Sequence, residues 1–387
     1  MFIRLSYPRH DPRNLLLAVV LAFAVLDHTR MFFYYWNTNP VAIANTSLAV
    51  FLTRFLSHFF APAVMFILGI EIFLYCQRYG STMLNKALCC TGGILLLLEL
   101  LVNNFLYTFD IYYRTIGLFI LGLIGLCLIC MIGLHYLGRK AVLIISLTLL
   151  LGHNLLDKIQ FEGHSLSSIC WYLLHQQKFI AVDDRMFIVN YTLIPWLAVL
   201  MLGYHFGKLY LPYANPKKRK QILIIAGWLT IALFVVLRFL NNYGDPVVWH
   251  YDAQVEKTVM SFLNLTKYPA SLDYLSLTLG PIFLFLGYTA DIKIINGIFF
   301  TALAKRPLFV YLFSTLLIHF IAMVFLWVGG NDIASMVITS SSYKKNSPLA
   351  QYGYPIEIVY LLWTGIILLL CCLCSVERWF GRDYEKS

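Results

Sequence analysis

Three ionisable residues, Asp27, His28 and Arg30, lie close together in the first apolar stretch of the chain. The apolar run 15–26 precedes them and the run 31–36 follows. A membrane-spanning helix needs about 20 residues, so the helix must carry all three side chains inside the bilayer. Each such side chain costs roughly 2.5–3.5 kcal/mol at the membrane centre. A cost of this size, met three times in one helix, predicts a functional site.

These side-chain types are suited to proton transfer and to the stabilisation of negative charge. Histidine titrates near neutral pH and accepts a proton from a hydroxyl or an amine. A carboxylate orients a histidine ring, and arginine donates paired N–H groups to a carboxylate, a phosphate or a developing oxyanion. Acyl transfer uses all three roles. Proton-coupled transport uses the same residue types, so the chemistry alone leaves both open.

The composition is that of a membrane protein. Of 387 residues, 60% are hydrophobic and 12% are charged, and the mean hydropathy is +0.74, whereas a soluble domain carries about 25% charged residues. The formal net charge of +10 does not indicate a nucleic-acid partner, because Lys and Arg lie mostly in connections between apolar runs. The nine cysteines lie mostly in apolar runs without zinc-site spacing. We therefore expect neither a disulfide framework nor a metal.

The pattern of apolar runs predicts an all-α, polytopic transmembrane helical bundle of about ten spans. The predicted spans are 14–36, 50–75, 87–107, 116–137, 141–157, 187–209, 222–240, 271–289, 308–328 and 355–375. Lys and Arg concentrate in alternate connections, which places both termini in the cytoplasm. We expect one integral-membrane domain over 1–387, with short cytoplasmic tails at 1–13 and 376–387.

Several connecting segments complete this prediction. No small-residue cleavage site follows the first apolar run, so we expect it to be a retained helix rather than a signal peptide. Three long segments, 158–186, 241–270 and 329–354, face the external side. Within the first of them, 166–181 is predicted to form an interfacial helix.

With this orientation, polar side chains of several spans fall at one depth, in the external halves. We expect them to line one pocket. Pro62 cannot donate to the carbonyl of His58, so a helix break is predicted there. The predicted catalytic residues are His28, Asp27, His58 and Arg54. The predicted substrate-binding residues are Arg30, Glu99, Asn103, His153, Asn154, Asp157, Arg238, Asn241, Asp245, Lys267, Tyr268 and His319.

Six strings carry a resemblance to a known family. They are LDHTR (26–30), FLTRFLSHFFAPAVMFILG (51–69), GHNLLD (152–157), LIPWLAVLMLGYHFG (193–207), LRFLNNYGDP (237–246) and SFLNLTKYPASLDYLSLTLGP (261–281). In this order and spacing the chain resembles the heparan-α-glucosaminide N-acetyltransferase-like family, and in particular its bacterial branch. The resemblance extends over roughly residues 14 to 380.

The resemblance implies a membrane acyltransferase that takes an acetyl group from cytoplasmic acetyl-CoA. The acceptor would be a sugar amine or hydroxyl on the external side, and the location a bacterial inner membrane. Characterised members have an asparagine at the position of His28 and a catalytic histidine between spans 1 and 2. That segment, residues 37–49, contains no histidine here. By location, we expect His28 or His58 to take this role. The basic run Lys217–Lys220 could attract the phosphates of acetyl-CoA.

Two alternatives remain open at this point. A proton-coupled transporter would use the same intramembrane His, Asp and Arg residues, although the sequence shows no inverted repeat of the kind common in transporters. A non-catalytic membrane scaffold is the third possibility. The expected partners of the enzyme are membrane lipids, acetyl-CoA and a glycan or amino-sugar acceptor.

Overall fold

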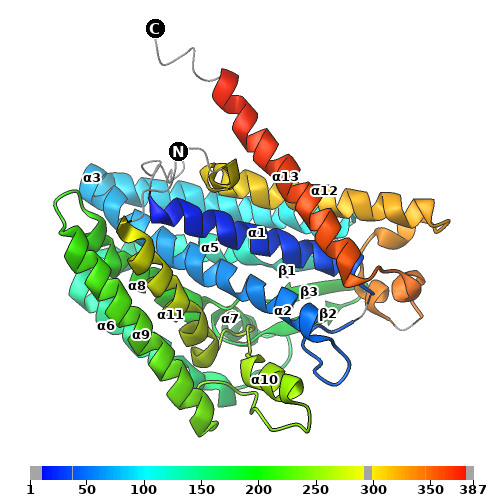
Figure 1. Cartoon of the computed structure of the whole chain (residues 1–387), viewed down its shortest axis with the longest axis horizontal. Helices are drawn as coiled ribbons and strands as arrows, with labels where there is room; N and C mark the ends of the chain where they lie inside the picture. Colours follow the sequence, from blue (N-terminus) through cyan, green and yellow to red (C-terminus); the bar gives the residue numbers. More distant parts are fainter. Residues whose placement is uncertain (1–10, 37, 292–298, 345, 381–387) are drawn as a thin grey trace. The chain divides into compact units, whose positions relative to one another are not determined.

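A computed structural model describes residues 11–36, 38–291, 299–344 and 346–380. Residues 1–10 and 381–387 of the predicted tails lie outside the described residues. The described chain is an all-α polytopic helical protein with one small sheet (Figure 1). Seven of its helical stretches are long and apolar enough to cross a membrane. They are Pro12–Phe33, Leu48–Thr108, Ile120–Leu137, Arg139–Lys158, Pro216–Leu240, Pro307–Val328 and Ile356–Ser375.

Each predicted span coincides with helix in the structure. The 61-residue stretch Leu48–Thr108 contains two predicted spans, with a change of direction at Gly80, whose φ is 80°. The predicted spans 187–209 and 271–289 correspond to the shorter helices α8 (Leu193–Phe206) and α11 (Leu272–Tyr288). The spans predicted from 116 and 187 each begin with strand residues. The helix of the first begins at Ile120, within about four residues of the prediction, whereas that of the second begins only at Leu193.

The chain forms two compact units, which are described separately. Among the described residues, unit 1 contains Ala61–Asn104 and Arg114–Ala290. Besides α8 and α11, its helices are α3 (Phe60–Leu97), α5 (Ile120–Leu134), α6 (Arg139–Gly152), α7 (Leu166–Leu174), α9 (Pro216–Leu240) and α10 (Val255–Leu263). Within unit 1, α6 packs on α8 and α9 packs on α11.

The sheet of unit 1 has three short strands, β1 (Thr115–Leu118), β2 (Lys178–Val182) and β3 (Arg185–Val189). Their order is β1-β3-β2, with β1 parallel and β2 antiparallel to β3. The helix predicted over 166–181 is therefore only half correct. Helix α7 ends at Leu174, and the β-branched and aromatic residues that follow pair as β2.

Glycines allow two helices of unit 1 to cross at backbone contact. A Cβ added at Gly203 of α8 would lie 2.1 Å from the carbonyl oxygen of Phe66, and one added at Gly69 of α3 would lie 2.1 Å from that of Leu200. Small residues of this kind let membrane helices approach closely and gain van der Waals contact.

The first testable prediction follows from this crossing. We expect Gly203→Ala to lower the free energy of unfolding by about 1–3 kcal/mol, because the new methyl group forces α3 and α8 apart. Thermal unfolding in detergent measures the effect. Gly93→Ala is the control, since Gly93 lies in the partner helix α3 and a Cβ added there meets nothing within 4 Å. Equal melting temperatures for the two variants would contradict the prediction.

Unit 2 is built from three stretches of chain: the described residues up to Phe60, Phe105–Tyr113, and the described residues from Asp291 on. Its helices are α1 (Pro12–Phe33), α2 (Leu48–Leu56), α12 (Pro307–Val328) and α13 (Ile356–Phe380), and α4 (Asn104–Thr108) leads into the middle stretch. Helix α1 packs against both α12 and α13.

Local sequence explains where the helices of unit 2 begin and break. Asp11 caps α1 by accepting from the backbone N–H of Arg13, and Pro12 occupies the first turn. Ser47 caps α2 in the same way. The break predicted near Pro62 is confirmed, because a 3₁₀ segment at Ser57–Phe59 separates α2 from α3. This break places Ser57 and His58 outside regular α-helix.

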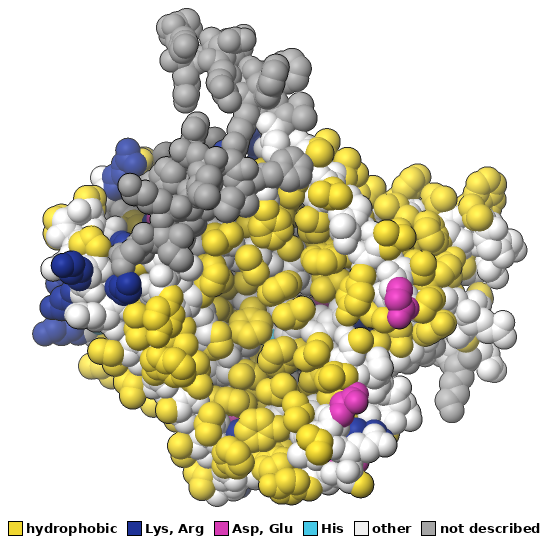
Figure 2. All heavy atoms as spheres, in the orientation of Figure 1, with side chains coloured by type: hydrophobic (Ala, Val, Ile, Leu, Met, Phe, Trp, Pro, Cys, Tyr) yellow, Lys and Arg dark blue, Asp and Glu magenta, His cyan; other side chains and the backbone are white. Residues whose placement is uncertain are grey.

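The surface agrees with a lipid environment. Figure 2 shows a face covered largely by hydrophobic side chains. On α9, for example, Leu229, Val236 and Leu240 are more than half exposed. Lys and Arg side chains gather at the end of unit 1 where α8 connects to α9 (Figures 1 and 2).

Candidate functional site

Three of the predicted charged residues, Asp27, Arg30 and Arg54, form a nearly buried cluster in unit 2. The Asp27 carboxylate accepts hydrogen bonds from Nε and Nη2 of Arg30, at 3.1 and 3.0 Å, through Oδ1. Its Oδ2 accepts from Nη1 of Arg54. The pair predicted from the i,i+3 spacing of Asp27 and Arg30 is thus confirmed. One carboxylate therefore binds two guanidinium groups.

The helix break after α2 completes this cluster. Arg54 lies in the last turn of α2, and the Oγ of Ser57, in the 3₁₀ segment, lies 3.0 Å from Oδ2 of Asp27. Three side chains, from α1, α2 and the break, therefore meet at the carboxylate of Asp27. Sequence reasoning missed Ser57, because an isolated serine in an apolar run carries no signal.

His28 projects from a different face of α1 than Asp27 and Arg30. Its Nε2 lies 2.6 Å from the hydroxyl of Tyr107, and its Nδ1 lies 3.4 Å from Oγ1 of Thr315. The ring of Tyr311 also packs edge-on against it. Consecutive helical residues do not face each other, which explains why Asp27 and His28 contribute to separate clusters. Tyr107, Tyr311 and Thr315 were not among the predicted site residues.

The other two predicted histidines of unit 2 are buried. His58 is 4% exposed and packs against the ring of Phe55. His319, in α12, is fully buried, and its two ring nitrogens lie 2.9 Å from the carbonyl oxygen of Leu106 and 3.0 Å from that of Met336. Its role as a substrate ligand stays a prediction.

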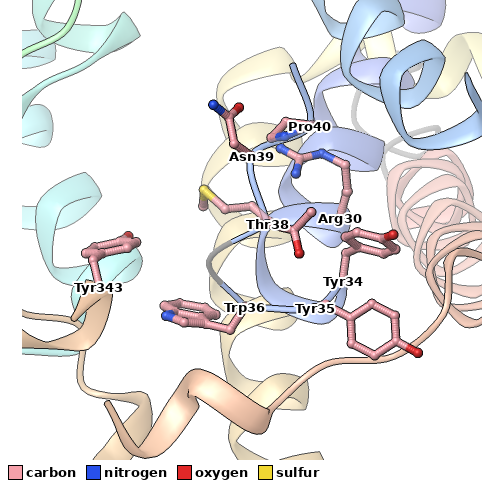
Figure 3. A pocket seen from close by; sticks show the side chains of 9 residues that line it. Arg30, Tyr34, Tyr35, Trp36, Thr38, Asn39, Pro40 and Tyr343 are labelled. Carbon is pink, nitrogen blue, oxygen red and sulfur yellow. The ribbon is translucent and has the colours of Figure 1, made fainter. Parts of the chain in front are cut away.

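A pocket of about 300 Å³ opens beside the Asp27 cluster, at the end of α1. Figure 3 shows the Arg30 guanidinium turned toward Asn39 and Pro40, with Trp36 facing Tyr343 on the other side. The rings of Trp36 and Tyr343 are stacked, with centroids 5.7 Å apart. The remaining lining residues are Met31, Tyr34, Tyr35 and Thr38. Arg30 thus lines this pocket while its Nε and Nη2 bond to Asp27.

In unit 1, Glu99 joins two helices. It lies in a π-helical turn, Leu98–Asn103, and accepts at Oε1 from Asn103 at 2.6 Å and at Oε2 from the backbone N–H of Gly122 at 2.8 Å. Gly122 is in the first turn of α5, where unpaired N–H groups and the helix dipole favour a carboxylate. Asn104 fixes the neighbouring strand through both backbone groups of Gly117.

A second prediction separates this structural role of Glu99 from substrate binding. We expect Glu99→Gln to cost about 1–3 kcal/mol of stability, because an amide cannot satisfy both Asn103 and the N–H of Gly122 as well as a carboxylate does. Melting temperature and the specific activity of the folded fraction are measured together. Loss of specific activity at an unchanged melting temperature would instead support a substrate contact.

The predicted cluster at the end of α6 is also held together within unit 1. Asn154 donates to Oδ2 of Asp157 at 2.7 Å and accepts from the N–H of Leu272 at 2.9 Å. Nε2 of His175 lies 2.9 Å from Oδ1 of Asp157. His153 lies against the carbonyl oxygens of Leu149 and Ala270. Sequence reasoning missed His175, which follows α7 and comes 18 residues after Asp157, in the connecting segment that begins at 158.

The residues predicted to form an acceptor site on the external loop make contacts to that loop. Arg238 donates to four carbonyl oxygens, those of Val247, Ser261, Phe262 and Asn264. Both amide atoms of Asn241 bond to the backbone of Trp249.

Asp245 accepts hydrogen bonds from Thr266, Ser271 and Val247. Burial raises the pKa of Asp245, and these hydrogen bonds oppose the rise. Lys267 lies over the ring of Tyr268, whose hydroxyl donates to Tyr191. These contacts define the loop conformation, and substrate binding by these residues stays a prediction.

The structure thus brings together some of the predicted residues. In unit 2, Asp27, Arg30 and Arg54 meet directly, with His28 on the adjacent face of α1. In unit 1, Glu99 bonds to Asn103 and Asn154 bonds to Asp157, while Arg238 and Asp245 both bond to the backbone of Val247. That all of them line one pocket stays a prediction.

The fold and the buried charges identify the class of protein. It is a multi-pass helical membrane protein with polar side chains buried among its helices. A family model for the catalytic region of heparan-alpha-glucosaminide N-acetyltransferase matches residues 17–243. The chain belongs to this family, and membership indicates a membrane acetyltransferase. No curated protein sequence matches the chain.

Proposed function

We propose that this protein transfers an acetyl group from cytoplasmic acetyl-CoA to an amine or hydroxyl of a sugar on the external side of the membrane. The observation that carries the proposal is the position of the polar site. Asp27, His28, Arg54 and Tyr107 all lie within the residues that match the catalytic family model. His28 contacts the hydroxyl of Tyr107, and the two arginines Arg30 and Arg54 contact the carboxylate of Asp27.

The contacts within unit 2 support a role for each of these residues. His28 acts as the general base, since one of its nitrogens already faces a hydroxyl at 2.6 Å. The arginines beside Asp27 supply the positive charge that a carbonyl oxygen needs as it becomes an oxyanion. Asp27 holds both guanidinium groups in place. His58 is the second candidate base, and its burial against Phe55 makes it the weaker one.

The pocket at the end of α1 fits a sugar acceptor. Its aromatic residues, Tyr34, Tyr35, Trp36 and Tyr343, offer flat apolar faces to a sugar ring. Arg30, Thr38 and Asn39 offer hydrogen bonds to ring substituents. A few polar groups in a mostly apolar concave site are typical of small-molecule sites, which measure about 300–1,000 Å³.

The test is acetyl transfer by the full chain purified in detergent, with radiolabelled acetyl-CoA and a panel of amino sugars and neutral sugars. We expect label in at least one sugar and release of free CoA. Trp36→Ala should raise the KM for the sugar and leave the dissociation constant of acetyl-CoA unchanged. No acetyl-CoA binding, no hydrolysis and no transfer would overturn the proposal. Sugar-driven proton flux in liposomes without transfer would favour the transporter.

A further inference from the structure

We infer that Tyr107 relays the proton between the acceptor and His28, and that His319 is the positioning residue that holds Tyr107 in reach. This inference rests on the proposed acetyl transfer with His28 as the base. It concerns unit 2 alone, where α1, α12 and the stretch Phe105–Tyr113 belong together.

The donor and the acceptor of each hydrogen bond around His28 can be assigned. The hydroxyl of Thr315 donates to the carbonyl oxygen of Tyr311 at 2.9 Å. A hydroxyl has one proton to donate, so Oγ1 of Thr315 can only accept from Nδ1 of His28, 3.4 Å away. The ring proton of neutral His28 is therefore on Nδ1. Nε2 carries the lone pair, and the hydroxyl of Tyr107 donates to it at 2.6 Å.

This arrangement lets Tyr107 stand between the acceptor and the base. The acceptor gives its proton to Oη of Tyr107 while the phenol proton of Tyr107 passes to Nε2 of His28. The acceptor nitrogen or oxygen bonds to the acetyl carbon, the carbon–sulfur bond breaks, and the electron pair leaves on sulfur. The proton on His28 then returns through Tyr107 to the thiolate. The products are the acetylated acceptor and CoA thiol, with no net proton gained or lost.

His319 fixes the backbone next to Tyr107. Both of its ring nitrogens face carbonyl oxygens, Leu106 at 2.9 Å and Met336 at 3.0 Å. A carbonyl oxygen only accepts, so a neutral His319 ring donates to one of these carbonyls and lies against the other.

Two aromatic rings hold the imidazole of His319 in place. Phe109 stacks on His319 with centroids 4.0 Å apart, and Phe32 lies at 4.6 Å. Leu106 immediately precedes Tyr107, and the N–H of Ile338 donates to the carbonyl of Thr108 on its other side at 2.8 Å. The backbone is thus held on both sides of the relay residue.

The first arm of the test removes the hydroxyl alone. In the full chain in detergent, Tyr107→Phe should lower kcat for acetyl transfer by about 100-fold, the lower range of acid–base contributions, with acetyl-CoA affinity unchanged. If the wild type is active and Tyr107→Phe retains its turnover, the relay is overturned. If the wild type transfers no acetyl group, the proposed function is overturned instead.

The second arm compares two conservative variants of His319. The amide nitrogen of asparagine can replace Nδ1 and keep the bond to Leu106, whereas that of glutamine can replace Nε2 and keep only the bond to Met336. We expect His319→Gln to lower kcat at least 10-fold and His319→Asn to retain most of it, with similar KM values. Equal losses of kcat that follow the melting temperatures of the two variants would overturn the positioning role.

A spectroscopic arm does not depend on turnover. In protein labelled with ¹⁵N-histidine, the His28 signals, assigned by their loss in His28→Gln, should show a protonated Nδ1 and an unprotonated Nε2. The Nε2 signal should move in Tyr107→Phe, because its donor is lost. A protonated Nε2, or an Nε2 signal that Tyr107→Phe leaves in place, would overturn the relay whatever the activity.

Discussion

Replacement of His28 by alanine is expected to lower the rate of acetyl transfer by about 10²–10⁴-fold, the usual contribution of a positioned acid or base. The imidazole is the group whose Nε2 faces the Tyr107 hydroxyl at 2.6 Å, and alanine offers no proton acceptor in its place. Initial rates with labelled acetyl-CoA and an accepted sugar measure the effect. Acetyl-CoA binding should persist, because the substitution removes a proton acceptor and leaves the arginines of the Asp27 cluster in place.

Two matched histidine variants make this result specific. His58→Ala removes the other candidate base, and His250→Ala removes an exposed histidine of the loop 241–254. We expect a modest loss of stability for the first and no effect for the second. If His58→Ala loses transfer while His28→Ala keeps it, the assignment of the base to His28 is wrong.

Asp27→Asn is expected to cost about 3–5 kcal/mol of stability, the usual cost of removing one partner from a buried ion pair. Arg30 and Arg54 then lose their shared carboxylate while both side chains remain largely buried, at 10% and 17% exposure. The substitution keeps the size of the side chain, so the loss reports charge rather than packing. Thermal unfolding in detergent gives the magnitude, and acetyl transfer should fall as the arginines lose their orientation.

A double-mutant cycle that combines Asp27→Asn with Arg54→Gln tests the direct contact. The double variant leaves only the charge of Arg30 without its carboxylate, whereas Asp27→Asn alone leaves the charges of both arginines. The double variant should therefore be more stable than the sum of the single losses predicts, by about 0.5–3 kcal/mol. Strictly additive losses would mean that Asp27 and Arg54 do not stabilise each other.

The sequence predicts the helices well because membrane spans are long apolar runs that few other structures produce. It fails where an apolar run begins as a strand. Residues 115–118 and 185–189 read as the starts of spans, yet they pair as β1 and β3. Periodicity does not separate a short buried strand from a helix end, and the pairing joins segments about 70 residues apart, which no local pattern reveals.

The site was predictable only in part. Asp27 and Arg30 could be paired from their spacing on one helix, whereas the contact of Arg54 with Asp27 depends on how α2 packs and where it breaks. Residue type alone did not show that Arg238 and Asn241 bond to their own loop backbone. Tyr107 carried no signal, since one tyrosine at the end of an apolar run is common, and only the tertiary structure brings it to His28.

The three-part composition of unit 2 has a consequence for biosynthesis. His28 is made early, but its Nδ1 partner Thr315 follows 287 positions later in the chain. At a synthesis rate of about 5–20 residues per second, this interval lasts about 15–60 s. During that time α1 is in the membrane with its charged residues while unit 2 is incomplete. A nascent chain stalled before α12 would therefore contain Asp27, His28 and the arginines of the Asp27 cluster. It would still lack Thr315, the partner that sets the His28 tautomer.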